Sequence, residues 1–342
     1  MADAQRKPKP PMSRLTRLSL RVVDRVTDAT RRADGTLNRC ALSLLDPRVP
    51  AVSSPCRGVA TRDVVVDRAL RLRARLFHPA AAATSAPGAP LPVIVFFHGG
   101  GFAFLSAASP AYDAACRRIA RYSGAAVLSV DYRRAPEHRF PAPYDDGVAA
   151  LRFLDDPKNH HPAVPLDVSR CYLAGDSAGG NIAHHVARRY ATDAASFRHV
   201  RVAGLVAIQP FFGGEERTPA ELRLDGAAPI VSTARTDWLW RAFLPPGADR
   251  THEGANFAAP AAAAGLDSPA FPPVLLAIGG YDPLQDWQRR YGEMLRRKGK
   301  DVRVVEYPNA IHAFYVFPVF DDARDLMIRI AEFVAESAGG NQ

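Results

Sequence analysis

The sequence predicts an α/β fold: a mostly parallel, doubly wound sheet flanked by helices. Short apolar segments with strand character alternate with longer segments whose apolar residues recur at helical spacing. The segment Val93-Ile94-Val95-Phe96-Phe97 is apolar on both faces, as expected of a strand that helices cover on both sides. Because strands that alternate with helices form βαβ units, most of the sheet is expected to be parallel.

The expected elements follow the chain in order. Residues 63–66 and 70–77 alternate enough to form a β-hairpin ahead of the parallel strands. Further strands are expected at 93–97, 125–130, 171–174, 202–208, 274–278 and 302–305. Helical patterns cover about 112–122, 145–155, 178–191, 286–298 and 322–336.

Near the N-terminus, a tail expected to be disordered at residues 1–12 precedes an amphipathic helix. Ser13 is its expected N-cap, and its apolar stripe consists of Leu15, Leu18, Val22, Val23, Val26 and Ala29. The polar side is rich in arginine, so binding to a membrane surface and a transit peptide are alternatives to packing on the domain. We favour packing, because Asp24 and Asp28 interrupt the basic face.

Composition excludes several classes of protein. The formal net charge of +9 comes with scattered arginines and no recognisable nucleic-acid-binding motif, so a nucleic-acid partner is not expected. The four cysteines form no C-x-x-C pair, which fits a reducing compartment. No apolar run is long enough to span a bilayer. We therefore expect a cytoplasmic protein, with the nucleus also open, that needs no cofactor and no metal.

Two glycine-rich motifs follow strand-like segments. The first is His98-Gly99-Gly100-Gly101-Phe102, and the second is Gly175-Asp176-Ser177-Ala178-Gly179-Gly180-Asn181. In the second, a serine between two glycines is typical of a sharp strand-to-helix turn that exposes the hydroxyl. In the first, backbone N–H groups without flanking side chains can bind an oxyanion. Together the motifs predict an acyl-transfer site with Ser177 as nucleophile.

A serine nucleophile requires a histidine base and a carboxylate. Asp282 follows the strand expected at 274–278, and His312 is the one histidine beyond the last expected strand, so the chain order is Ser, Asp, His. Asp267 and Asp286 are worse placed, in a loop before the strand and inside a helix. We expect His312 to deprotonate Ser177 and Asp282 to orient His312, with the N–H groups of Gly99, Gly100 and Ala178 holding the oxyanion.

The two motifs together resemble the hormone-sensitive-lipase-like branch of the α/β-hydrolases, and the segment Asp131-Tyr132-Arg133-Arg134-Ala135-Pro136-Glu137-His138 strengthens the likeness. More narrowly, residues 32–333 are similar to plant carboxylesterases. Segments 31–36, 44–50 and 212–218 are also similar to the gibberellin receptors of the same group. The resemblance implies an α/β-hydrolase fold and hydrolysis of small or medium carboxylic esters.

In those receptors, N-terminal helices close as a lid over the hormone, and an aliphatic residue replaces the catalytic histidine. This sequence keeps His312, and it has Gly101 and Ala178 where the receptors typically have serine. The departures favour an esterase over a hormone-binding protein. By the same likeness Asp237 lines the acyl or ligand pocket, with an ordinary N-cap or salt bridge as the alternative.

The domain division follows from length and from this likeness. At 342 residues and 47% hydrophobic, the chain can form one large domain with additions. We expect a tail and helical lid over 1–60 and a catalytic domain over 61–342, with an insertion at 211–260 near the pocket. Three alternatives to an esterase stay open: a hormone-binding receptor, a dehydratase or lactone-forming enzyme, and a membrane-anchored protein. No protein partner can be named.

Overall fold

The computed structural model describes residues 10–32, 34–80 and 89–336, so most of the expected N-terminal tail lies outside the described residues. The centre is an eight-stranded sheet in the order β1-β2-β4-β3-β5-β6-β7-β8. Strands β3 to β8 are mutually parallel, whereas β1 pairs antiparallel with β2, and β2 with β4. The predicted mostly parallel sheet and its leading hairpin are therefore confirmed.

The strands lie where the sequence predicts them: β6 has the predicted bounds, β2 and β4 are shifted by two residues and by one, and the others are longer. They are β1 (Val59–Asp67), β2 (Leu72–Pro79), β3 (Leu91–Phe97), β4 (Ala126–Asp131), β5 (Leu166–Asp176), β6 (Val202–Ile208), β7 (Val274–Tyr281) and β8 (Val302–Ile311). The helices are α1 (Arg14–Ala29), α2 (Arg39–Leu45), α3 (Pro110–Ser123), α4 (Ala142–Asp155), α5 (Ala178–Thr192), α6 (Pro219–Leu224), α7 (Thr233–Phe243), α8 (Gln285–Arg297) and α9 (Asp321–Glu336), with short 3-10 turns between some of them.

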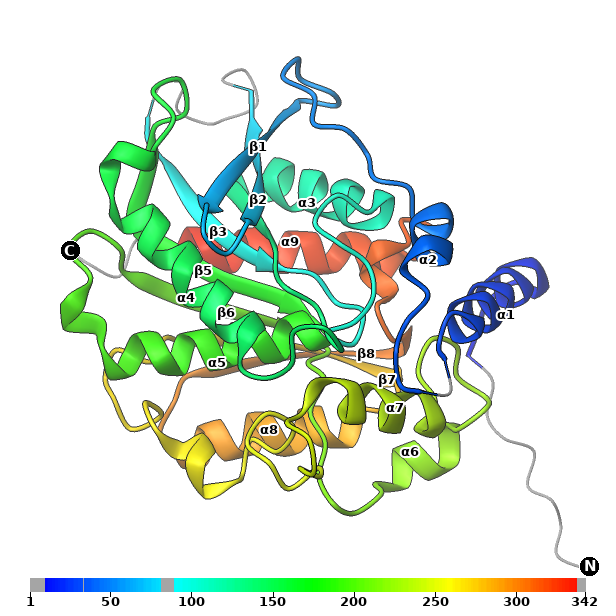
Figure 1. Cartoon of the computed structure of the whole chain (residues 1–342). Coiled ribbons are helices and arrows are strands. Elements are labelled where there is room, and N and C mark those ends of the chain that lie inside the picture. Colours follow the sequence, from blue (N-terminus) through cyan, green and yellow to red (C-terminus); the bar gives the residue numbers. More distant parts are fainter. Residues whose placement is uncertain (1–9, 33, 81–88, 337–342) are drawn as a thin grey trace, which may run out of the picture.

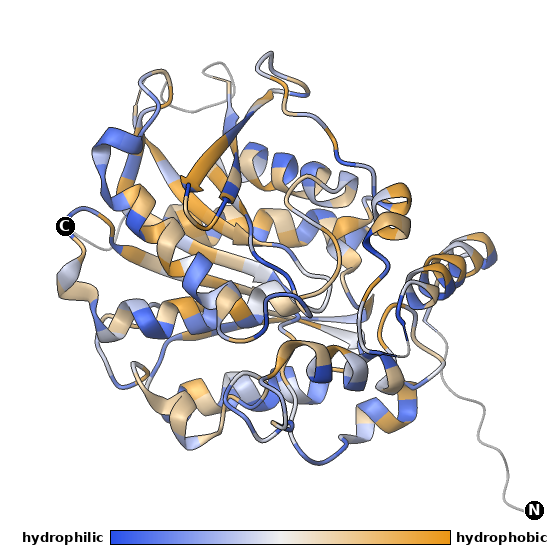
Figure 2. Cartoon of the chain, in the orientation of Figure 1, coloured by the Kyte–Doolittle hydropathy of each residue, from blue (hydrophilic) through white to orange (hydrophobic). Residues whose placement is uncertain are grey.

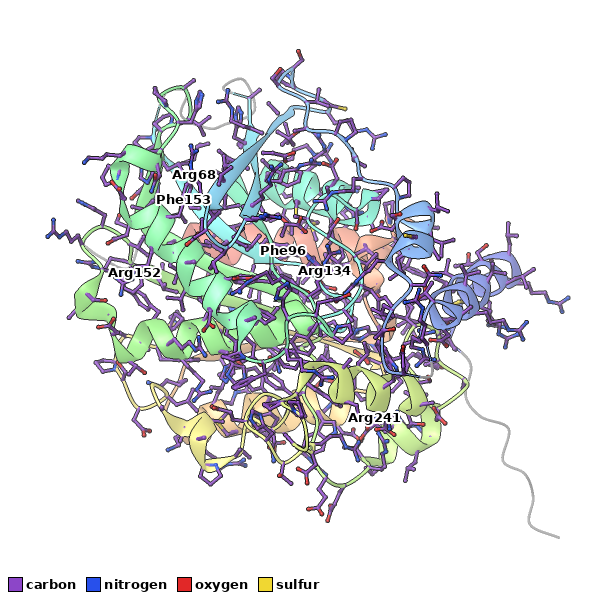
Figure 3. All side chains as sticks on the ribbon, in the orientation of Figure 1. Arg68, Phe96, Arg134, Arg152, Phe153 and Arg241 are labelled. Carbon is purple, nitrogen blue, oxygen red and sulfur yellow. The ribbon has the colours of Figure 1, made fainter. Side chains whose placement is uncertain are left out.

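Helices cover both faces of the sheet (Figure 1). On one face, α3 and α9 share a hydrophobic core with alternate strand residues such as Ile94 and Phe96; on the other, α4, α5 and α8 share a core with Val93, Val95 and Phe97. Figure 2 shows the apolar colour of these central strands, and Figure 3 places Phe96 in the middle of the molecule. The doubly apolar segment 93–97 is thus explained, because both of its faces are buried.

Helix α1 contacts the domain through the face opposite its apolar stripe. Ser13 caps the helix as expected, accepting a hydrogen bond from the N–H of Thr16 at 3.0 Å. The stripe itself is exposed, however, with Leu15 at 74% and Val23 at 58% of full exposure (Figure 2). The expected packing of this helix on the domain is thus observed, but it does not use the apolar stripe, and what holds α1 in place is polar.

Polar contacts from α7 and from the loop before it hold α1. The guanidinium of Arg235 bonds the carboxylates of Asp24 at 2.7 Å and Asp28 at 2.8 Å, and the N–H of Ile230 bonds Asp24 at 3.0 Å. Of the α1 residues, only Leu20 is buried. The two aspartates that interrupt the basic face are thus the residues that dock the helix.

The expected insertion carries α6 and α7. Its aromatic segment packs against the first glycine-rich loop, since the Phe243 ring stacks on Phe102 with centroids 3.7 Å apart and the Trp240 ring lies 5.7 Å from that of Phe102. A Cβ atom built on Gly101 would lie 2.4 Å from Cδ1 of Leu239. The insertion therefore borders the loop that was predicted to bind the oxyanion. In the described part of the chain, no helix has the length and apolar character needed to cross a membrane.

Candidate active site

Ser177 sits on a sharp turn between strand β5, which ends at Asp176, and helix α5, which begins at Ala178. Its φ of 52° and ψ of −120° are strained values for a residue with a side chain. The flanking glycines are required by contact: a Cβ on Gly179 would lie 1.9 Å from the carbonyl oxygen of Phe97, and one on Gly175 would lie 2.4 Å from the Gly179 carbonyl carbon. The predicted strand-turn-helix geometry is confirmed.

Asp282 and His312 come together from the ends of neighbouring strands β7 and β8. Nδ1 of His312 lies 2.7 Å from Oδ2 of Asp282, and both side chains are buried. Because the carboxylate accepts, Nδ1 carries the proton and Nε2 is left as the basic nitrogen. Burial lowers the pKa of His312, but the charge and hydrogen bond of Asp282, with a smaller contribution from Asp176, outweigh it and raise the pKa above its ordinary 6.5.

The Asp282 carboxylate has donors on both oxygens. The N–H of Leu284 bonds Oδ1 at 2.9 Å, while the side-chain amides of Gln209 and Gln288 bond Oδ2 at 2.9 and 2.8 Å. These bonds compensate the carboxylate for its complete burial. The two rival carboxylates lie elsewhere: Asp267 pairs with Lys298, and Asp286 accepts the N–H of Ala220.

Sequence reasoning missed Gln209, which connects the two loops that carry Asp282 and His312. Its Nε2 also donates to the carbonyl of Ile311 at 3.1 Å, and its Oε1 accepts the N–H of Ala313 at 2.8 Å. Gln209 directly follows β6 and has a positive φ of 44°. A polar residue next to a wholly apolar strand, at the edge where the candidate residues meet, is the signal that could have found it.

The first glycine-rich loop differs from the prediction at one position. The N–H of Gly99 donates to Oη of Tyr112 at 2.7 Å and to Oδ1 of Asp176 at 2.9 Å, so it is not available to an oxyanion. The prediction that the N–H of Gly99 binds the oxyanion is therefore wrong. Among the described residues, the N–H groups of Gly100, Gly101 and Ala178 have no hydrogen-bond acceptor. Three donors thus remain, with Gly101 in place of Gly99.

His98 orients the start of the glycine-rich loop. Its Nδ1 bonds the carbonyl oxygen of Gly99 at 2.8 Å, and its ring stacks on Tyr132 with centroids 4.2 Å apart. Burial lowers the pKa of His98 to about 4, so the ring is neutral at pH 7. His184 and His185 lie buried on α5 and do not contact the candidate dyad.

Comparison with known proteins identifies the family. Residues 94–316 match a family model described as the alpha/beta hydrolase fold. The chain belongs to this family. It is 42% identical over 313 residues to "Gibberellin receptor GID1C" of Arabidopsis thaliana, covering 89% of both chains, and 34% identical to "Carboxylesterase 20" of the same plant, covering 82% of this chain and 86% of the other.

Solved structures of the alpha/beta hydrolase family give the same result. The hyperthermophilic esterase from Pyrobaculum calidifontis superposes with a TM-score of 0.75 at 28% identity, covering 96% of this chain and 99% of that one. The thermostable carboxylesterase EstE1 from a metagenomic library superposes with a TM-score of 0.68 at 27% identity, covering 94% of this chain and 96% of the other. The resemblance to esterases and to gibberellin receptors is therefore confirmed.

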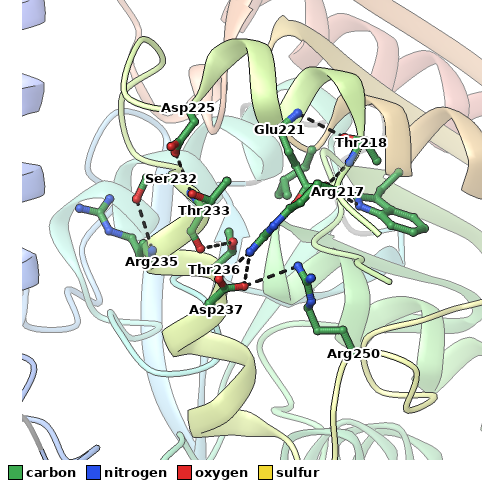
Figure 4. Close-up of polar contacts among 12 residues, drawn as sticks. Arg217, Thr218, Glu221, Asp225, Ser232, Thr233, Arg235, Thr236, Asp237 and Arg250 are labelled. Carbon is green, nitrogen blue, oxygen red and sulfur yellow. Dashed lines mark hydrogen bonds and ion pairs between the residues drawn. The ribbon is translucent and has the colours of Figure 1, made fainter. Parts of the chain in front are cut away.

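Asp237 is engaged in ion pairs in this member of the family. Both of its carboxylate oxygens lie 2.5 Å from a guanidinium nitrogen of Arg217, and Arg250 approaches to 3.5 Å (Figure 4). Ser232, not Asp237, caps α7. Arg217 also bonds Glu221, so the cluster joins α6 to α7. Of the two sequence-based alternatives, the observed contacts are those of the salt bridge.

Proposed function

We propose that this protein is a carboxylesterase that cleaves small or medium carboxylic esters through Ser177, His312 and Asp282. The observation that carries the proposal is the 2.7 Å contact between His312 Nδ1 and the buried Asp282, at the same sheet edge as a strained serine turn. Esterases among the relatives and among the solved structures support the same class of reaction. We further propose that the reaction takes place in the cytoplasm and that it needs no cofactor.

The reaction would proceed in two steps. His312 Nε2 takes the proton of Ser177 as Oγ attacks the ester carbonyl, and the tetrahedral intermediate collapses when Nε2 protonates the leaving alcohol. Water then attacks the acyl-enzyme, giving its proton to Nε2, and the carboxylic acid leaves as Ser177 recovers its proton. Asp282 keeps Nδ1 protonated and stabilises the imidazolium throughout.

The N–H groups of Gly100, Gly101 and Ala178 would hold the negative charge that develops on the carbonyl oxygen. All three are without an acceptor among the described residues, and Ala178 begins α5, whose N-terminal dipole favours an anion. Losing one donor of this kind typically lowers turnover by about 10²–10³-fold. The proposed donor set differs from the sequence-based one only at Gly99.

The proposal is tested with p-nitrophenyl acetate and a fluorophosphonate label. Wild-type protein should hydrolyse the ester and take up the label, whereas Ser177→Ala should do neither, with turnover reduced by at least about 10³-fold. The matched control is Ser169→Ala, an exposed serine on the same strand, which should retain full activity. Equal hydrolysis by Ser177→Ala and wild type would refute the assignment.

A second candidate function is binding of a gibberellin with little or no turnover, favoured by the 42% identity to a gibberellin receptor. Two observations argue against it. Leu239 fills the space that the serine typical of the receptors would need at position 101. His312, which an aliphatic residue replaces in the receptors, is present and pairs with Asp282. Calorimetric titration with gibberellin distinguishes the two. Tight binding without ester turnover favours the receptor, and mass spectrometry of products separates hydrolysis from dehydration or lactone formation.

A further inference from the structure

A second carboxylate, that of Asp176, lies beside the nucleophile and takes no part in the proposed triad. Asp176 ends β5, directly before Ser177, and its side chain is buried at 1% exposure. Oδ1 accepts the N–H of Gly99 at 2.9 Å, and Oδ2 accepts the hydroxyl of Tyr112 at 2.9 Å. Its two partners belong to the oxyanion loop and to helix α3, so this side chain connects three separate segments.

Both backbone polar groups of Gly99 are hydrogen-bonded. Its N–H is shared between Asp176 and Tyr112, while its carbonyl oxygen accepts from Nδ1 of His98 at 2.8 Å. The same loop turns directly afterwards, because the carbonyl of Gly100 accepts the N–H groups of Ala103 and Phe104. The two peptides that carry the proposed donors therefore start from a fixed orientation.

Gly99 packs tightly against the side chains of Asp176 and Tyr112. A Cβ atom on Gly99 would lie 2.6 Å from both Oδ2 of Asp176 and Oη of Tyr112. Tyr112 is itself held in place: its side chain is 3% exposed, and its ring lies 5.4 Å from that of His98 and 6.2 Å from that of Phe96. The loop thus rests directly on the polar ends of these two side chains.

The charge of Asp176 strengthens the hydrogen bonds that it accepts. Burial raises the pKa of Asp176 to about 6, and the neighbouring hydroxyls of Tyr112 and Tyr315, the charge of His312 and the N–H of Gly99 oppose that rise. The group is mainly ionised at neutral pH, and hydrogen bonds to an ionised acceptor are the stronger ones. Removing a donor from a buried carboxylate leaves part of it unsatisfied, so the neighbouring backbone is expected to shift.

We propose that Asp176 and Tyr112 are positioning residues that hold the Gly99 peptide so that the N–H groups of Gly100 and Gly101 converge with that of Ala178. The inference rests on the proposed esterase function. It predicts that losing the Tyr112 hydroxyl damages the transition state more than substrate binding. An oxyanion donor moved out of line stabilises the tetrahedral intermediate less, whereas it barely contacts the ground-state ester.

The test compares Tyr112→Phe with Tyr172→Phe. Both changes remove one buried hydroxyl, but that of Tyr172 donates to the carbonyl of Val334, far along the chain from the loop. With p-nitrophenyl acetate, Tyr112→Phe should lower kcat by about 10- to 100-fold with KM within about threefold. Tyr172→Phe should keep kcat within about twofold of the wild-type value, even if its thermal stability falls as much as that of Tyr112→Phe. Equal kcat values for the two variants overturn the proposal.

Hydrogen exchange gives a second reading that does not depend on turnover. The amides of Gly99, Ala103 and Phe104 are hydrogen-bonded in the loop, so a peptide covering residues 98–104 should exchange faster in Tyr112→Phe and in Asp176→Asn than in Tyr172→Phe. Unchanged exchange in this peptide overturns the proposal. The two proposals can fail separately. If the wild type neither hydrolysed esters nor took up fluorophosphonate, but exchange in this peptide were still faster in the variants, the positioning role of Asp176 and Tyr112 would be supported and the esterase function refuted.

Discussion

The serine turn with its glycine loop and the helix α1 are built in opposite ways. Around Ser177, polar groups are buried and each is held by specific partners, such as the four hydrogen bonds between Asp282 and its neighbours. In α1, the apolar stripe is exposed, and the helix is held chiefly by Arg235 through Asp24 and Asp28. The first region depends on exact geometry, and the second on a small number of ion pairs. Mutations should therefore affect activity in one and local opening in the other.

The largest effect is expected at Asp282. Asp282→Asn presents an amide that can donate to Nδ1 of His312, which favours the tautomer with the proton on Nε2 and removes the base. We expect kcat for p-nitrophenyl acetate to fall by about 10⁴-fold. Asp286→Asn is the matched control, since Asp286 lies on the following helix and bonds Ala220 instead; its kcat should stay within about threefold. Similar losses in the two variants would contradict the assignment of the acid.

The next effect concerns stability at the serine turn. Gly179→Ala places a Cβ atom 1.9 Å from the backbone oxygen of Phe97, and the next nearest atoms, in Phe97 and His98, are also backbone, so no side chain can move to relieve the clash. We expect the free energy of unfolding to drop by more than about 3 kcal/mol, measured by urea denaturation. Gly292→Ala, whose Cβ would meet side-chain atoms alone, the nearest being the end of Leu276 at 3.0 Å, should change the free energy of unfolding by less than about 1 kcal/mol. A Gly179→Ala protein as stable as that control would show that the turn is not sterically determined.

This contrast explains what the sequence could and could not predict. Ser177, Asp282 and His312 were placed correctly relative to strand ends, because a glycine-flanked serine and parallel strands leave few alternatives. Gly99 was assigned wrongly, since the partners of its N–H come from α3 and β5, which are distant in sequence. Gln209 was missed for a similar reason, because its role depends on two loops that only the fold brings together.

The face through which helix α1 docks could not be predicted, for a different physical reason. Helical periodicity shows that apolar residues share one face, but it does not show which face meets the domain. Here a buried arginine on α7 supplied a stronger local partner for Asp24 and Asp28 than the domain surface supplied for the valines and leucines. An acidic pair on a basic helix is thus a candidate docking feature, even when an apolar stripe lies opposite.

A smaller effect is expected when the polar contact of α1 is removed. Arg235→Met should raise the fraction of time that α1 is detached from the domain. Trypsin should then cleave at the arginines of α1 about 5- to 30-fold faster than in the wild type, while the midpoint of global unfolding changes little. Arg241→Met is the control, because Arg241 is exposed on the same helix α7 (Figure 3). Equal cleavage rates in the two variants would mean that Arg235 does not hold the helix.

The smallest effect is expected from the stripe itself, and it decides the orientation of α1. Leu18 and Val22 are 59% and 53% exposed, so the double change Leu18→Ser and Val22→Ser should alter the free energy of unfolding by about 0.5 kcal/mol or less and leave trypsin cleavage of α1 unchanged. Leu20, two residues away on the docked face, is 5% exposed, and Leu20→Ser should accelerate that cleavage. If the stripe variant were cleaved faster and Leu20→Ser were not, α1 would dock through its apolar face, and the polar contact with Arg235 would be secondary.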